Sequence, residues 1–175
     1  THPVLRELSR IQAYDKYFDA DKVRVARQAY FGMVSYLDHC IGQVLTALEA
    51  SPYADSTRVI YTTDHGDNIG HRGMWGKSNM YEESAALPLI IAGGDVPQGH
   101  VVDTPVSLVD CYPTLVTGAG LPLSELELAE LPGHSLIDIA KGATPERTIL
   151  SEYHASSATT GFFMIRHGDY KYVHY

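Results

Sequence analysis

A long amphipathic helical pattern followed by a short β-branched strand is the feature that most constrains the fold of this chain. Apolar residues recur at spacings of three and four over residues 26–48, and Asp19 and Asp21 are suited to cap that helix. Residues 57–63 then combine β-branched and aromatic side chains between turn signals, which is typical of a buried strand. A second apolar run, residues 87–92, follows a glycine-rich loop. This alternation predicts an α/β sheet.

The patterns on either side of this unit are shorter. Residues before the helix are polar and irregular, so no element is expected there. A proline near its start and glycines at its end favour a short helix at residues 113–120, and residues 122–132 favour a surface connection or a short helix. Strands are predicted near the end of the chain, the last two as a hairpin, at residues 148–154, 161–166 and 170–175.

Composition excludes several classes of protein. With 175 residues and 45% hydrophobic content, the chain has the size of a globular domain with a sizeable core. A net charge of −8 with no long basic run argues against nucleic acid as a partner. No apolar stretch is long enough to span a membrane, and residues 1–10 lack the layout of a secretory signal, so no membrane association is expected. Cys40 and Cys111 have no zinc spacing and leave open both a disulfide and the choice between a cytoplasmic and a periplasmic or secreted location.

Candidate chemistry is concentrated where the first strand ends, at Asp64-His65-Gly66. Ligands bind outside the carboxyl ends of strands in open α/β sheets, and a buried carboxylate there needs a partner. A metal ion, a cation such as Lys77 or Arg72, or a helix amino-terminus would serve, and His65 offers a nitrogen ligand. The same residues also fit a strand-to-loop turn in which Asp64 only caps backbone amides. Spacing alone does not separate these two interpretations.

The order of several sequence blocks carries more information than any single motif. In sequence they are Tyr30 with Met33 to Gly42, Asp55 to Gly66, Gly70 to Lys77, Tyr81-Glu82, Pro88 to Ile91, Val109 to Leu115, and Ser151 to Tyr172. From about Ala26 onward this order resembles the second half of the formylglycine-dependent sulfatases, in the alkaline-phosphatase-like superfamily. The loop around Trp75 is similar to choline-sulfatase-like and arylsulfatase-like members.

The resemblance implies part of an alkaline-phosphatase-like mixed sheet flanked by helices. Residues 1–145 would form the carboxyl-terminal part of the catalytic α/β domain, and residues 146–175 the start of a small antiparallel β subdomain. It also implies metal-dependent hydrolysis of a small-molecule sulfate monoester. Homo-oligomerisation is left open.

The resemblance also implies roles for single residues. Asp64 and His65 would bind a divalent metal, usually Ca²⁺, although the imidazole also suits Mn²⁺. Lys77 would contact the sulfate oxygens. His71 and Arg72 either line the substrate pocket or lie on a solvent-facing loop. Supporting roles are expected for neighbouring polar residues: loop capping for Asp67 and Asn68, bracing for Tyr81 and Glu82, and a structural or pocket-rim position for His154.

The family nucleophile is missing from these residues. Sulfatases use a Cys/Ser-x-Pro-x-Arg motif whose first residue becomes formylglycine, but the segment that begins at Cys111 has Leu115 in place of the arginine. Together with a start at Thr1 and an end within a strand-like run, this predicts a piece of a longer enzyme, inactive alone, with its nucleophile upstream. Two alternatives remain: a phosphonate monoester or phosphodiester hydrolase of the same superfamily, and a non-catalytic binding or assembly module.

Overall fold

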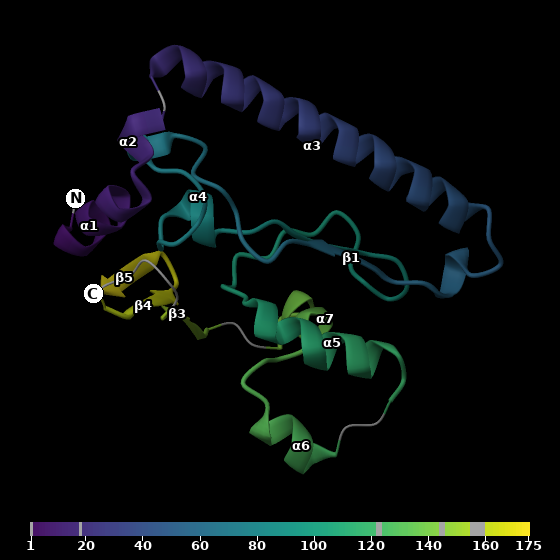
Figure 1. The fold of residues 1–175 in the computed structure, drawn as a ribbon. Helices are drawn as coiled ribbons and strands as arrows, with labels where there is room; N and C mark the ends of the chain where they lie inside the picture. Colours follow the sequence, from purple (N-terminus) through teal and green to yellow (C-terminus); the bar gives the residue numbers. More distant parts are fainter. Residues whose placement is uncertain (1, 18, 122–123, 144–145, 155–159) are drawn as a thin grey trace.

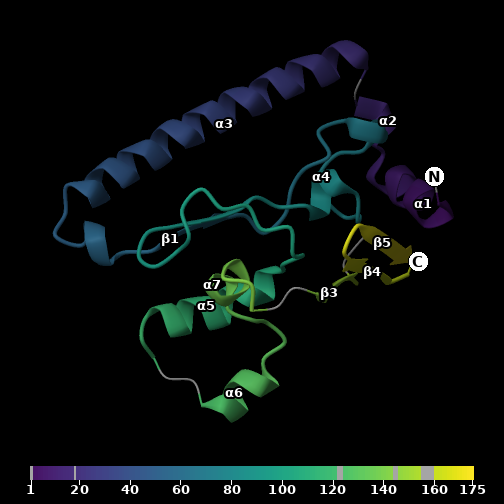
Figure 2. The same cartoon turned by 180° about the vertical axis from the view of Figure 1, so that it is seen from behind.

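The structure is a computed structural model that describes residues 2–17, 19–121, 124–143, 146–154 and 160–175. Its strands form a two-stranded ribbon, β1 (Val59–Thr62) with β2 (Leu89–Ala92), and a separate three-stranded sheet. A long helix, α3 (Ala20–Glu49), runs along one side of the ribbon, and α5 (Cys111–Gly118), α6 (Glu125–Glu130) and α7 (Leu136–Ala140) lie on the other side in both views (Figures 1 and 2). No helix in the described ranges is both long and apolar enough to cross a membrane.

Helix α3 confirms the predicted long helix and its cap. Asp19 is the N-cap, and its side chain accepts a backbone N–H of the first turn at 2.9 Å, while Asp21 lies in that turn. The whole helix is described, and none of its side chains is buried; Phe31 and Met33 are 60% and 63% exposed. The apolar periodicity therefore predicted the helix correctly, although no element of this structure covers the apolar face.

The prediction of an irregular opening was wrong, because residues before α3 form α1 (Pro3–Gln12) and α2 (Tyr14–Tyr17). Pro3 occupies the first helical turn, where a missing N–H costs nothing. Leu5 and Leu8 follow at a spacing of three and are each 2% exposed, in a cluster with Met74. The spacing of Leu5 and Leu8 was the sequence signal for this helix, but the charged residues around them made the apolar pattern hard to recognise.

Both predicted strands of the ribbon are confirmed, but the expectation of a buried first strand was wrong. The two strands are antiparallel, with Val59 opposite Ala92 and Thr62 opposite Leu89. Tyr61 on β1 is 37% exposed, and no other strand of the described chain pairs with either outer edge of the ribbon. The 3₁₀ turn η1 (Ala54–Ser56) precedes β1, and the loop between the two strands carries the 3₁₀ turn η2 (His71–Gly73) and then the short helix α4 (Glu82–Ala85).

Residues after the ribbon form four short helical elements and the small sheet. These are η3 (Leu108–Asp110), α5 (Cys111–Gly118), α6 (Glu125–Glu130) and α7 (Leu136–Ala140), followed by β3 (Thr148–Tyr153), β4 (Phe162–His167) and β5 (Tyr170–His174). The sheet is antiparallel in the order β3-β4-β5, which confirms the predicted hairpin. Its turn uses Gly168 at φ 51°. Phe162 and Met164 on one face of β4 are buried against Met80.

A buried ion pair joins these two parts of the chain. Asp110 is fully buried, and its two carboxylate oxygens accept from the guanidinium of Arg147 at 2.9 Å each. Backbone N–H groups of Ser107 and His134 also donate to this carboxylate. A buried charge is tolerated when its partners are complete, so this pair fixes the start of α5 against the segment that leads into β3.

Candidate active site

Asp64 and His65 come one residue after the end of β1 and are held there by a close backbone contact. The N–H of Gly66 donates to the carbonyl of Ser84 in α4 at 3.0 Å. A Cβ on Gly66 would overlap the carbonyl oxygen of Glu83, so only glycine lets the strand end pack this tightly against α4. Helix α4 thereby sets the position of the two candidate metal ligands.

The structure brings together Asp64, His65 and Lys77, which are spread over a glycine-rich loop in the sequence. Lys77 Nζ lies 2.6 Å from His65 Nε2, and His65 Nε2 lies 3.5 Å from Asp64 Oδ2. His65 Nδ1 lies 2.9 Å from the carbonyl oxygen of Gly66, which can only accept, so Nδ1 carries the ring proton. Nε2 therefore presents a lone pair, which the lysine ammonium uses here and which a metal ion could use instead.

Asp64 caps a backbone amide and also faces the His65 ring. Its Oδ1 accepts the backbone N–H of His65 at 3.0 Å, which is the capping role, while Oδ2 faces the imidazole. Desolvation raises the pKa of Asp64, but the neighbouring His65 ring, backbone hydrogen bonds and the charge of Lys77 outweigh it and leave that pKa below its ordinary value. The side chain is 80% exposed, so the expected cost of a buried carboxylate does not arise. An exposed anion beside an unprotonated ring nitrogen is open to a cation.

The loop between His65 and Lys77 is closed by the two residues expected to cap it. Asp67 Oδ1 accepts the N–H groups of Ile69 at 2.7 Å and Gly76 at 3.1 Å. Asn68 is fully buried, and its amide donates to the carbonyl of Gly76 at 2.6 Å. These bonds tie the start of the loop to its end, so Lys77 returns to the end of β1.

His71 and Arg72 lie elsewhere, against Glu83 of α4. Arg72 Nη1 donates to both carboxylate oxygens of Glu83 at 2.7 Å, and its guanidinium lies 4.4 Å from the ring centroid of Tyr81. His71 Nδ1 contacts the same carboxylate. The hydrogen bond from Arg72 is the largest cause that lowers the pKa of Glu83 to about 2. The structure thus joins these two residues to a brace and does not bring them to Asp64, His65 and Lys77.

Two further residues also behave as braces. Glu82 forms an ion pair with Lys171 of β5, and the N–H of Tyr81 donates to the side chain of Asn79 at 2.9 Å. His154 Nε2 lies 2.9 Å from a carboxylate oxygen of Glu152, an exposed structural contact. These outcomes agree with the supporting roles that the sequence predicted.

A groove with a volume of about 940 Å³ contains the three assembled residues. Asp64, His65 and Lys77 line it together with residues of the small sheet, including Tyr153, Met164, Arg166 and Lys171. We call it the Lys77 groove. The sequence did not identify these sheet residues as part of the site. Its only signal was the alternation along β4, which places Arg166 on the same face as the buried Met164.

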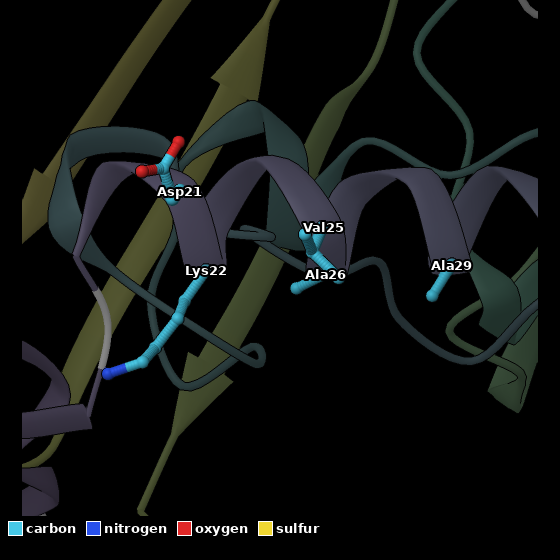
Figure 3. A pocket seen from close by; sticks show the side chains of 5 residues that line it. All are labelled: Asp21, Lys22, Val25, Ala26 and Ala29. Carbon is cyan, nitrogen blue, oxygen red and sulfur yellow. The ribbon is translucent and has the colours of Figure 1, made fainter.

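A second depression lies on α3, where Asp21, Lys22, Val25, Ala26 and Ala29 line it (Figure 3). Its walls are almost entirely apolar, and the polar groups at its rim belong to Asp21 and Lys22. It contains none of the candidate site residues and offers no chemistry for a sulfate ester.

The metal ligands available in this chain are few. Within the described ranges no group of three or more His, Cys, Asp and Glu residues is arranged to hold a metal ion. Asp64 and His65 would supply only two ligands, whereas Ca²⁺ takes six to eight oxygen ligands. Further ligands would have to come from outside these residues.

Cys111 does not have the properties of a nucleophile. It begins α5, outside the residues that line the Lys77 groove. Desolvation and the nearby carboxylate of Asp110 raise its pKa, which lowers the fraction of reactive thiolate.

Comparison with known proteins identifies the family. A model of the family described as "Sulfatase" matches residues 1–121. Choline-sulfatase of Rhizobium meliloti (strain 1021) is 38% identical over 155 residues, which are 88% of this chain and 30% of that protein. Arylsulfatase K of Danio rerio is 34% identical over 99% of this chain and 34% of its own length. The chain therefore spans about a third of the curated relatives that it matches.

Solved structures agree with this assignment. A putative sulfatase from Bacteroides thetaiotaomicron VPI-5482 has a TM-score of 0.74 at 27% identity, over 90% of this chain and 35% of that one. The phosphonate monoester hydrolase SpPMH from Silicibacter pomeroyi has a TM-score of 0.83 at 23% identity, over 99% of this chain and 39% of that one, and shows the shared fold. The alkaline-phosphatase-like fold is thereby confirmed, and the chain belongs to the sulfatase family.

Proposed function

We propose that this chain supplies the metal-binding pair and the sulfate-contacting lysine of a sulfuric ester hydrolase. The observation that supports this most strongly is the convergence of Lys77, His65 and Asp64 in one groove at the end of β1. The lysine ammonium suits a sulfate ester, whose negative charge is spread over several oxygens, while the carboxylate and the imidazole lone pair suit a metal cation beside it. The substrate class is a small-molecule sulfate monoester.

Asp64 and His65 fit a divalent cation chemically. The exposed Oδ2 of Asp64 and the unprotonated Nε2 of His65 lie 3.5 Å apart and face each other. The carboxylate oxygen suits Ca²⁺, our first choice, while the imidazole nitrogen also suits Mn²⁺. When bound, such an ion would polarise the sulfate and stabilise negative charge that develops on it.

The residues of this chain would then divide the remaining tasks. Lys77 would hold a sulfate oxygen through its ammonium group, and the Asp67 and Asn68 bonds would keep that lysine in place. The Gly66 carbonyl would keep the proton of His65 on Nδ1, so that Nε2 stays unprotonated. The nucleophile, a formylglycine in this family, would come from outside these residues.

The test is hydrolysis of 4-nitrophenyl sulfate by the intact polypeptide that contains this chain, beside a phenylphosphonate monoester and a phosphate diester. The proposal predicts the highest kcat/KM for the sulfate ester, with intact mass showing conversion of a cysteine or serine to formylglycine. A preference for the phosphonate or the diester would assign the chain to the rival hydrolases. No turnover of any of them with Ca²⁺ or Mn²⁺ would support the non-catalytic alternative.

A further inference from the structure

We propose that the Lys77 groove binds a second anionic group of the substrate at Arg166, so that the preferred ester carries two negative groups. This inference rests on the proposed sulfatase function, because it concerns the same groove beyond the lysine. Arg166 lies on β4 and lines the groove. Its side chain makes no ion pair or hydrogen bond with any residue in the described part of the chain.

The sheet register places a second cation beside it. Arg166 lies directly opposite Lys171 on β5, and both side chains line the groove. Like charges directly opposite each other destabilise a sheet. Glu82 pairs with Lys171 but not with Arg166, so only one of the two cations has a carboxylate partner. A bound anion would offset the remaining positive charge.

Apolar neighbours strengthen any interaction made at this place. Ile149 pairs with Arg166 from the other side and is 8% exposed, and Met164, two positions before Arg166 on the same face, is 7% exposed. A charge beside such a surface is less screened than one in open water. The planar guanidinium can donate two parallel hydrogen bonds to a carboxylate or a sulfate.

The other charged residues of the groove do not neutralise Arg166. Arg147 is already paired with Asp110, and Glu152 is bonded to His154. Asp103, from the loop before η3, lines the groove but forms no ion pair with Arg166 in the structure.

The sheet also indicates how far apart the two anionic groups lie. Tyr153 donates its hydroxyl to Ser78, the residue after Lys77, at 3.0 Å. Tyr153 pairs with Phe162, and Arg166 follows four positions later on β4. At roughly 3.3 Å for each residue, this is roughly 13 Å of strand. The second anionic group would therefore bind well away from the sulfate, on an elongated substrate.

Competitive inhibition of the intact polypeptide tests this arrangement. The probes are biphenyl-4-sulfonate, biphenyl-4,4′-disulfonate and 4′-carboxybiphenyl-4-sulfonate, with 4-nitrophenyl sulfate as the reporter substrate. We expect the dianions to inhibit wild type roughly tenfold more tightly than the monoanion, through one added charge-assisted contact. Whichever of the two dianions inhibits more tightly shows whether the second anionic group of the substrate is a sulfate or a carboxylate.

Arg166→Gln is expected to remove this advantage, with little change in the KM of the reporter substrate or the Ki of the monoanion. Arg166→Lys is the matched control that keeps the charge and retains part of the advantage. Equal Ki values for the three probes on wild type, which needs no variant, would overturn the proposal, as would an advantage that survives Arg166→Gln. If the reporter substrate is not hydrolysed, the proposed function fails, while calorimetric Kd values for the same probes still decide the anion site.

Discussion

Lys77 and His65 share a single lone pair, since the lysine Nζ lies 2.6 Å from the imidazole Nε2 whose ring proton is held on Nδ1 by the carbonyl of Gly66. The lone pair can accept from an ammonium group or bind a metal ion, but not both. Metal binding should therefore displace Lys77 from His65 and free its ammonium for the sulfate. Metal binding and sulfate binding by Lys77 are thus coupled through His65 Nε2.

The first prediction follows from that competition. Lys77→Met removes a positive charge and the competing donor, so we expect the variant to bind Ca²⁺ or Mn²⁺ more tightly, by roughly three- to tenfold. The same variant should hydrolyse sulfate esters far more slowly. Calorimetric titration of metal into wild type and variant measures the first effect. An unchanged or weaker metal affinity would show that Lys77 does not compete for Nε2.

A second prediction concerns the brace at Glu83. Its pKa is lowered to about 2 from an ordinary value of 4.5, chiefly by the hydrogen bond from Arg72. A lowered carboxyl pKa stabilises the fold at pH values above 4.5, and this contribution is lost as the pH falls from 4.5 towards 2.

Thermal unfolding of wild type and Glu83→Gln over this range measures the effect. Wild type should have the higher Tm at pH 6, and the difference should shrink as the pH falls below 4.5. A Tm difference that is constant with pH would mean that the Glu83 charge contributes no stability.

The third prediction concerns the buried pair of Asp110 and Arg147. Arg147→Met leaves a fully buried carboxylate without its cation, and loss of one partner from such a pair costs about 3–5 kcal/mol of unfolding free energy. Urea denaturation of the variant measures this cost. Lys141→Met, which removes a cation from the half-exposed Asp95, is the control and should have a much smaller effect. Equal losses in the two variants would contradict the structural role given to the buried pair.

The fourth prediction compares two glycines. Gly66→Ala has no room because the new Cβ would meet the carbonyl of Glu83, so the variant should move Asp64 and His65 and lose both stability and hydrolysis. Gly42→Ala lies on exposed α3 with nothing within 4 Å and should stabilise the helix by about 0.5–1 kcal/mol. Denaturation and 4-nitrophenyl sulfate assays on both variants test the comparison. Full activity in Gly66→Ala would show that the contact with α4 does not position the site.

Local signals in the sequence predicted most elements of the fold. Asp19 as a cap, the apolar spacing of α3, and the strands on both sides of the Gly168 turn all depend on neighbours within a few residues. Burial could not be predicted in this way: β1 was expected to be covered, yet Tyr61 is exposed. Burial depends on which distant segments pack against a strand, and periodicity carries no such information.

The residues of the candidate site, too, could be predicted only in part. Asp64, His65 and Lys77 could be named because the order of the surrounding blocks resembles a family, and the structure brings them together. The outer end of the Lys77 groove could not be named, because Arg166 lies there only through the register of the small sheet. Likewise, the sequence contains no local signal that pairs Asp110 with Arg147 over 37 positions.

The most direct test of the proposed site is the metal dependence of 4-nitrophenyl sulfate hydrolysis by the intact polypeptide, for wild type, Asp64→Ala and Lys77→Ala. We expect both variants to lose roughly 100- to 1000-fold in kcat/KM at low metal concentration. Raising the concentration of Ca²⁺ or Mn²⁺ should restore part of the loss in Asp64→Ala and none in Lys77→Ala, because only the first removes a metal ligand. Rates equal to wild type in both variants, at every metal concentration, would contradict the assignment of these residues to the active site.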